Sequence, residues 1–103
     1  MQFNWDPRKN KSNQEKHGIS FEEAKSVFYD DNARLIDDPD HSADEDRFII
    51  MGISDKLRIL TVCHCYRDDD VIRIISARKA TKPEKHFYQG NDHAWIIRFF
   101  EGT

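Results

Sequence analysis

Apolar residues form two dense runs in the second half of the chain. Residues 57–66 and 71–78 are rich in Val, Ile and Leu, which is typical of β-strands. Residues 67–70, Arg-Asp-Asp-Asp, predict a hairpin turn between them, and so short a connection requires antiparallel pairing. Shorter strands are predicted at residues 3–5, 33–36 and 47–53.

The first predicted helix covers residues 7–17. Asp6 suits its N-cap, a proline follows at the first helical position, and Gly18 suits a left-handed end. The helix has no apolar stripe, so it is either weakly packed or held by polar contacts. The side chains considered for such contacts are Asn13, Lys16 and His17.

Two further helices are predicted. Ser20 and Glu23 form a capping box, and apolar residues at helical spacing extend this second helix over 21–29. The third helix covers residues 83–88. The strands cluster rather than alternate with helices, which indicates one α+β domain over residues 1–103. It comprises a short N-terminal strand and two helices, then a small antiparallel sheet and a C-terminal helix.

The C-terminal extension, residues 91–103, is strongly apolar. Five large apolar side chains occur within it: Trp95, Ile96, Ile97, Phe99 and Phe100. We expect it to pack on the same chain, on a second copy or on a partner, because such side chains gain free energy by leaving water.

Charge is unevenly distributed along this chain of net charge −3. Residues 30–46 hold eight acids and one base, whereas residues 71–98 hold six bases and two acids. A local basic face, rather than net charge, governs anion capture. No run of about 18 apolar residues and no signal-peptide pattern is present, so we expect a cytoplasmic protein without a membrane span.

Two arginines interrupt the last apolar run. Arg73 and Arg78 lie in a predicted strand, where an unpaired buried guanidinium would cost several kcal/mol. Bound phosphate would satisfy such a group. The alternative is that both arginines are solvated or pair with acids.

The hairpin register decides which side chains meet. The register we favour places Tyr66 opposite Val71 and His64 opposite Arg73, and it keeps both cysteines in the core. A slip by one residue would pair Arg73 with the cysteines instead. In the favoured register, His64 could move protons and Arg73 could stabilise charge on a pentavalent phosphorus. The alternative for His64 is a local hydrogen bond within its strand.

Cys63 and Cys65 are expected to be small apolar core residues. Two residues apart on a strand, they lie about 6.6 Å from each other, near the upper limit for a disulfide. A metal site is not expected because His64 points to the opposite face. We therefore predict no metal and no cofactor.

Five motifs in a fixed order, with two C-terminal helix residues, Glu84 and Tyr88, resemble the BrnT family of toxins. The motifs are FNWDP (3–7), KHGISFEEA (16–24), DPDHS (38–42), EDRF (45–48) and RIISAR (73–78). The similarity covers roughly residues 3–90. It implies a RelE-like fold and the toxin of a type II toxin–antitoxin pair.

The resemblance further implies a ribonuclease that inhibits translation without a metal, in which a ribose 2′-OH attacks the adjacent phosphate. It implies a cognate BrnA-like antitoxin that binds DNA. A homodimer and a heterotetramer are both considered for the assembly, and the sequence does not choose between them. The catalytic candidates are Lys16, His17, His64, Arg73 and Arg78. The RNA-binding candidates are Arg8, Lys9, Arg47, Lys79, Lys82 and Tyr88. The second choices for a catalytic role are Glu45, Arg47 and Tyr88.

Other functions remain open at this point. A non-catalytic module could bind RNA or an acidic protein segment through the same basic face. A structural or regulatory protein could act only within its complex. For Tyr88, packing between the helix and the sheet is the alternative to a role in RNA binding or catalysis. An exposed ion pair with Glu45 is the alternative for Arg47.

Overall fold

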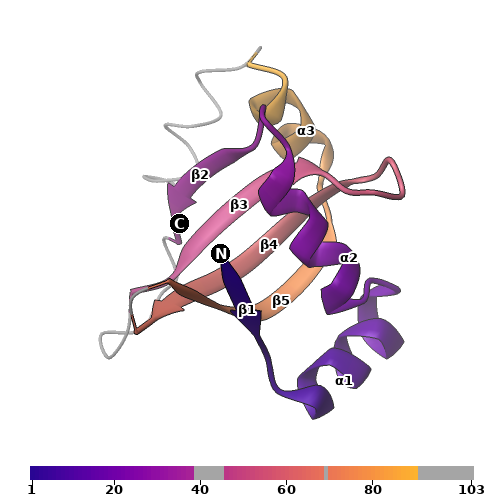
Figure 1. Cartoon of the computed structure of the whole chain (residues 1–103). Coiled ribbons are helices and arrows are strands. Elements are labelled where there is room, and N and C mark those ends of the chain that lie inside the picture. Colours follow the sequence, from indigo (N-terminus) through magenta and orange to yellow (C-terminus); the bar gives the residue numbers. More distant parts are fainter. Residues whose placement is uncertain (39–45, 69, 91–103) are drawn as a thin grey trace.

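A five-stranded sheet forms the centre of the protein, with helices on both of its faces (Figure 1). The computed structural model describes residues 1–38, 46–68 and 70–90. The predicted C-terminal extension and Glu45 lie outside these residues. The elements are β1 (Gln2–Asn4), α1 (Pro7–His17), α2 (Phe21–Ser26), the 3-10 helix η1 (Val27–Tyr29), β2 (Arg34–Asp37), β3 (Phe48–Ile53), β4 (Ile59–Arg67), β5 (Val71–Lys79) and α3 (Lys82–Tyr88).

The strand order is β1-β5-β4-β3-β2. β2 to β5 pair antiparallel, but β1 runs parallel to β5. The α+β class is therefore confirmed, and the strands that follow the two helices form the expected antiparallel sheet. The parallel pairing of the N-terminal strand β1 with β5, which makes the whole sheet mixed, was not predicted. The parallel pair is possible because the whole chain from α1 to β4 lies between the two strands, which gives ample length for a crossover.

α1 and α2 cover one face of the sheet, which we call the helix face (Figure 1). The main core lies there, where Phe21 and Val27 pack against Leu60, Val62 and other apolar strand residues. η1 approaches β3 so closely that a Cβ on Gly52 would lie 2.9 Å from Val27 Cγ1. The expected single helix over 21–29 is thus divided into α2 and a tighter 3-10 turn.

α3 packs on the opposite face, which we call the α3 face. Phe87 joins Ile49 and Met51 in a smaller apolar cluster there. The capping box that begins α3 is complete, since Thr81 and Glu84 bond to each other's backbone N–H. At α2, by contrast, Ser20 Oγ accepts from Glu23 N, while the Glu23 carboxylate accepts hydrogen bonds from Ser54 and Arg58.

Polar contacts hold α1 against the rest of the protein. Of the two alternatives given for this helix, weak packing or polar contacts, the second is therefore correct. The buried Asn13 side chain donates to the carbonyl oxygens of Ile19 and Ala77, both at 2.8 Å, and accepts from Ala77 N at 3.1 Å. Asn10 Oδ1 accepts from Phe21 N at 2.9 Å. Asp6 and Gly18 cap the helix as predicted.

The predicted hairpin register is wrong. Tyr66 pairs with Ile72, and His64 pairs with Ile74 rather than Arg73. Asp68 adopts a left-handed conformation (φ 36°), so the turn is tighter than expected and Arg67 becomes the residue opposite Val71. An irregularity at Cys63/His64 then shifts the ladder by one further residue.

Candidate RNA-binding site

A groove of about 260 Å³ lies on the α3 face of the sheet. Two arginines, an aspartate, a cysteine and two hydroxyl residues give it a polar lining. We call it the Arg78 groove, and its lining residues are Asp38, Arg47, Ile49, Thr61, Cys63, Ile75, Ser76 and Arg78. It therefore combines two of the arginines singled out from the sequence, Arg47 and Arg78.

A buried carboxylate holds Arg78 in place. Arg78 Nη1 and Nη2 donate to the two oxygens of Glu84 at 2.7 and 2.9 Å. Glu84 Oε1 also accepts from Thr61 Oγ1 and from Thr81 N. Burial opposes ionisation of Glu84, but these donors outweigh it and hold its pKa below its usual value. The alternative that a strand arginine pairs with an acid is thus correct for Arg78, whose side chain is still 40% exposed.

Cys63 and Asp38 lie together in the groove, with Cys63 Sγ 3.5 Å from Asp38 Oδ2. Burial and the negative charge of Asp38 raise the pKa of the thiol to about 12, and Arg47 only partly opposes this. Cys63 is therefore a neutral thiol at pH 7 and a poor nucleophile or metal ligand. Cys65 is buried, as expected, whereas Cys63 is only half-buried.

Arg73 lies outside the Arg78 groove, near the start of α1. Its Nη1 donates to Asn4 Oδ1 at 3.2 Å, and its charge acts on Asp6. Arg8 also binds Asp6, chiefly through its backbone N–H, and these contacts lower the pKa of Asp6. The fold thus brings two predicted cations, Arg8 and Arg73, together around one carboxylate.

His64 is fully buried on the helix face, away from Arg73. The rings of Phe28 and Tyr66 pack against it with centroids 4.8 and 5.3 Å away. Burial lowers its pKa to about 4, against a weak opposing contact with the Val62 carbonyl. The favoured geometry of a His64–Arg73 pair is therefore wrong, because the true register turns the histidine into the core. The alternative of a locally bonded strand histidine agrees with this position.

The remaining predicted cations lie around the groove or away from it. Lys79 lines a neighbouring groove of about 340 Å³ with Arg58 and Lys85. Lys82 is exposed at the start of α3. The other three belong to α1, which covers the helix face, and none of them lines the Arg78 groove: Lys9, Lys16 and His17.

Tyr88 links α3 to η1 rather than lining the groove. Its hydroxyl donates to Asp30 Oδ2 at 2.6 Å, and burial together with this bond raises its pKa to about 12. Packing, the alternative named for this residue, agrees with its position.

Sequence reasoning did not select Glu84, Asp38 or Thr61 as site residues. For Glu84 a signal was present, because Thr81 and Glu84 have the capping-box spacing and RIISAR ends three residues before Thr81. Asp38 begins the DPDHS motif, but the motif does not by itself indicate that this carboxylate lines a groove. For Thr61 no local signal exists, since strand pairing brings it to the groove.

Within residues 1–38, 46–68 and 70–90, no group of three or more His, Cys, Asp or Glu side chains is placed to hold a metal ion. In the same part of the chain, no helix combines the length and apolar character needed to cross a bilayer.

Comparisons with known proteins identify the family. The crystal structure of the ribonuclease toxin BrnT from Brucella abortus matches with a TM-score of 0.61 and 25% sequence identity, over 80% of this chain and 99% of that chain. No curated protein sequence matches the chain. A family model described as "Ribonuclease toxin, BrnT, of type II toxin-antitoxin system" matches residues 5–84. The chain therefore belongs to the BrnT family of ribonuclease toxins of type II toxin–antitoxin systems.

Proposed function

We propose that the chain is an endoribonuclease that cleaves RNA in the Arg78 groove, inhibits translation and is neutralised by a cognate antitoxin. The observation that carries this proposal is the placement of Arg47 and the Glu84-held Arg78 in one groove. Two guanidinium groups there can bind consecutive phosphates or one phosphate in its transition state. Family membership supports the reaction class.

The groove also holds the groups that 2′-OH chemistry needs. Asp38 is the lining carboxylate, so we assign it to accept the proton of the attacking 2′-OH. The P–O5′ bond breaks as the 2′,3′-cyclic phosphate forms, and the departing 5′ oxygen takes a proton from solvent water. Arg78 stabilises the charge that develops on the phosphoryl oxygens, and Glu84 keeps its guanidinium fixed, which avoids reorganisation during the reaction. No step requires a metal, so cleavage is proposed to be metal-independent.

The outer cations would bind flanking RNA. Lys79 and Lys82 adjoin the groove through β5 and α3, and Arg73 with Arg8 lies farther along the sheet edge. Catalytic roles for Lys16 and His17 stay predictions, because the structure places them outside the groove. His64 has no part in the proposed chemistry, since its ring is inaccessible.

The decisive experiment measures cleavage of a fluorescent single-stranded RNA by the purified chain, with and without EDTA. We expect cleavage in EDTA, and a fall in kcat of about 100-fold or more in Arg78→Ala and Asp38→Asn, because each loses a transition-state contact. Lys25→Ala, a cation on the helix face, is the matched control and should keep full activity.

Two results would contradict the proposal. Loss of activity in EDTA with recovery on adding zinc or magnesium would remove metal independence. RNA binding without any cleavage would favour the second candidate, a non-catalytic module, which the same cationic face also fits. Growth arrest on expression without the antitoxin, relieved by Arg78→Ala, tests the toxin role in cells.

A further inference from the structure

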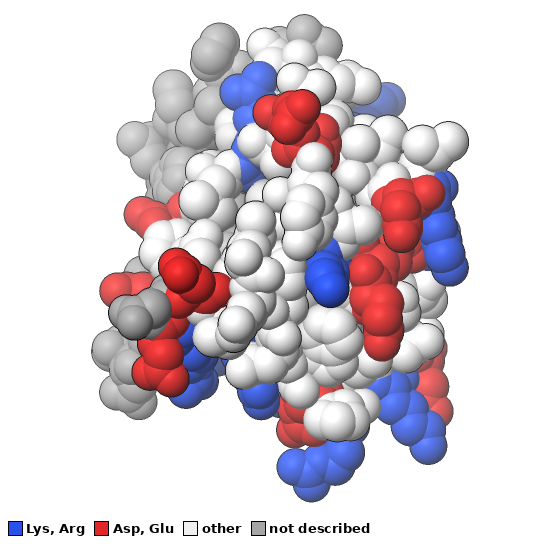
Figure 2. Space-filling model, viewed as in Figure 1, with Lys and Arg blue, Asp and Glu red and all other residues white. Residues whose placement is uncertain are grey.

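A second surface lies on the helix face, remote from the Arg78 groove. Large apolar side chains make it up, and four of them are strongly exposed: Met1 at 67%, Tyr29 at 60%, Leu35 at 53% and Tyr66 at 48%. We call this the aromatic surface; with these four, its residues are Phe28, Phe48 and Ile72. Figure 2 shows a broad area with few charges across the middle of this view, with both acidic and basic residues at its margins.

Two grooves lie within the aromatic surface. The first, of about 560 Å³, is lined by Met1, Phe28, Tyr66, Asp70 and Ile72. The second, of about 350 Å³, is lined by Leu35, Ile36, Asp37 and Phe48. The rings of Phe48 and Tyr66, 5.3 Å apart, join them into one continuous surface.

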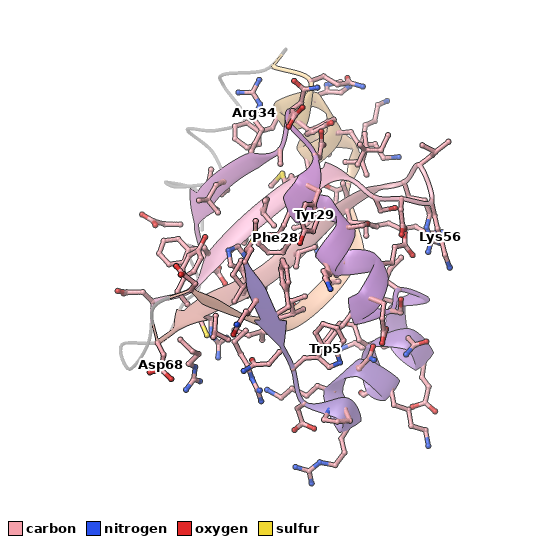
Figure 3. All side chains as sticks on the ribbon, viewed as in Figure 1. Trp5, Phe28, Tyr29, Arg34, Lys56 and Asp68 are labelled. Carbon is pink, nitrogen blue, oxygen red and sulfur yellow. The ribbon has the colours of Figure 1, made fainter. Side chains whose placement is uncertain are left out.

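The charge of these grooves is negative. Among the described residues that line them, two are aspartates, Asp37 and Asp70, and none is Lys or Arg. Asp68 adds a further exposed acid at the hairpin, which projects at the margin of this face (Figure 3). Lys25 is the exception nearby, and its ammonium lies over the Phe3 ring.

A rigid layer supports the surface from behind. Phe28, Phe48 and Tyr66 all contact the buried His64 ring, and Phe28 also packs edge-to-face on Phe3. Figure 3 shows Phe28 and Tyr29 next to each other in front of the sheet. A preformed apolar surface of this kind binds with little loss of side-chain entropy, which favours recognition.

This chemistry fits a protein and not an RNA. Exposed apolar patches of this character mark protein-binding sites, and aromatic side chains dominate the energetics of such interfaces. An RNA strand would bring its phosphates against Asp37 and Asp70, and like charges repel. A segment with apolar side chains flanked by Lys or Arg would meet both the rings and the acids favourably.

We propose that the aromatic surface binds the cognate antitoxin through a segment that presents apolar side chains flanked by lysine or arginine. This rests on the proposed function in one respect, the existence of a neutralising antitoxin. It adds the place of contact and its chemistry. The antitoxin then engages the sheet face opposite the Arg78 groove.

The test titrates the full-length chain with the purified antitoxin encoded beside it, by calorimetry. Tyr66→Ser removes an exposed ring and Asp70→Lys reverses a charge in the same groove. Each should weaken the Kd at least tenfold. Leu57→Ser, an 81% exposed apolar side chain outside the surface, and Asp55→Lys are the matched controls, and both should stay within twofold of wild type.

RNA cleavage by each variant is measured in parallel, and Tyr66→Ser and Asp70→Lys should keep wild-type activity, which shows that they fold. Tight antitoxin binding that neither substitution weakens would overturn this inference while the proposed function stands. Absence of cleavage by the wild-type chain would count against the proposed function alone.

Two other results would also overturn the inference, because each assigns the aromatic surface to a different occupant. A wild-type dimer that Tyr66→Ser makes monomeric would assign the surface to a second copy. Hydrogen exchange at Phe28 and Tyr66 that rises on deleting residues 91–103, and is unchanged by the antitoxin, would assign it to the chain's own C-terminal segment.

Discussion

Glu84 is a carboxylate with 3% exposure that receives four donors from three residues. Taking a carboxylate out of water is costly, and the Arg78 fork with the Thr61 and Thr81 donors offsets that cost. One side chain thus caps α3, joins it to β4 and β5, and fixes the guanidinium proposed to act on RNA.

Glu84→Gln should lower the free energy of unfolding by about 2 kcal/mol. The amide keeps one acceptor but leaves Arg78 without its counter-charge. The expected loss of stability is smaller than for a fully buried ion pair, because the Arg78 side chain is 40% exposed. Urea denaturation measures it. Glu22→Gln, an exposed acid of α2, is the control and should change stability by less than about 0.5 kcal/mol; equal effects in both variants would contradict the role given to Glu84.

His64 makes stability depend on pH. Its pKa is about 4 in the folded chain, against about 6.5 in an unfolded one. The folded state favours the neutral ring, so its contribution is complete above pH 6.5 and is lost as pH falls toward 4. Between pH 7 and pH 5 we expect a loss of about 2 kcal/mol in the free energy of unfolding.

Denaturation at a series of pH values checks this. His64→Phe should flatten the profile between pH 6.5 and pH 5, whereas His86→Asn, at an exposed position, should leave it unchanged. A wild-type profile retained in His64→Phe would show that another group titrates.

At the scale of elements, α1 shows how a helix can pack without an apolar face. Asn13 satisfies a β5 backbone N–H and two carbonyl oxygens that the fold removes from water. Unpaired buried groups of this kind cost about 1–3 kcal/mol each. The amide therefore substitutes for the stripe of apolar residues found on most surface helices.

Asn13→Ala should destabilise the protein by about 3 kcal/mol, because three backbone groups lose their partner at once. Thermal and urea melts measure this. Ser12→Ala, one position earlier and exposed, is the control with an expected change under about 0.5 kcal/mol. A small effect of Asn13→Ala would mean that water replaces the amide.

For the whole molecule, the two faces of the sheet carry different chemistry. The net charge is −3, yet Arg47 and Arg78 line the groove on the α3 face while aspartates line the grooves on the helix face. In the function proposed above, this separation by the sheet would let one small acidic protein present its arginines to RNA and its acidic, apolar surface to a protein.

RNA binding should therefore depend on salt despite the acidic composition. With about three phosphate contacts, raising monovalent salt from 50 to 200 mM should weaken the Kd for single-stranded RNA by roughly twentyfold. Fluorescence anisotropy measures it with Arg78→Ala and with the helix-face control Lys25→Ala. The slope should become shallower in Arg78→Ala only, and equal slopes in both would contradict RNA binding in the groove.

Most elements could be predicted locally. The ends of α1 follow from Asp6 and Gly18, and the hairpin follows from an apolar run on each side of an aspartate-rich turn. The site was predicted less well. Arg78 was selected as a charged residue within a strand and Arg47 through the family resemblance. The register was predicted wrongly, and the true register places His64 in the core rather than in the supposed site.

The sequence by itself determined α1, α3, the start of α2, the main strands, the family and the basic residues of the last strand, because each depends on residues that are close together in the chain. Only the tertiary structure decided which face of the sheet each strand side chain occupies. The left-handed Asp68 and the ladder shift at Cys63/His64 set which side chains of β4 and β5 point to which side. A one-residue shift exchanges the two faces of a strand. Strand pairing and the docking of α3 likewise placed Asp38, Thr61 and Glu84 around the arginines. The contacts of Thr61 with Glu84 and of Cys63 with Asp38 join residues 23 and 25 positions apart along the sequence.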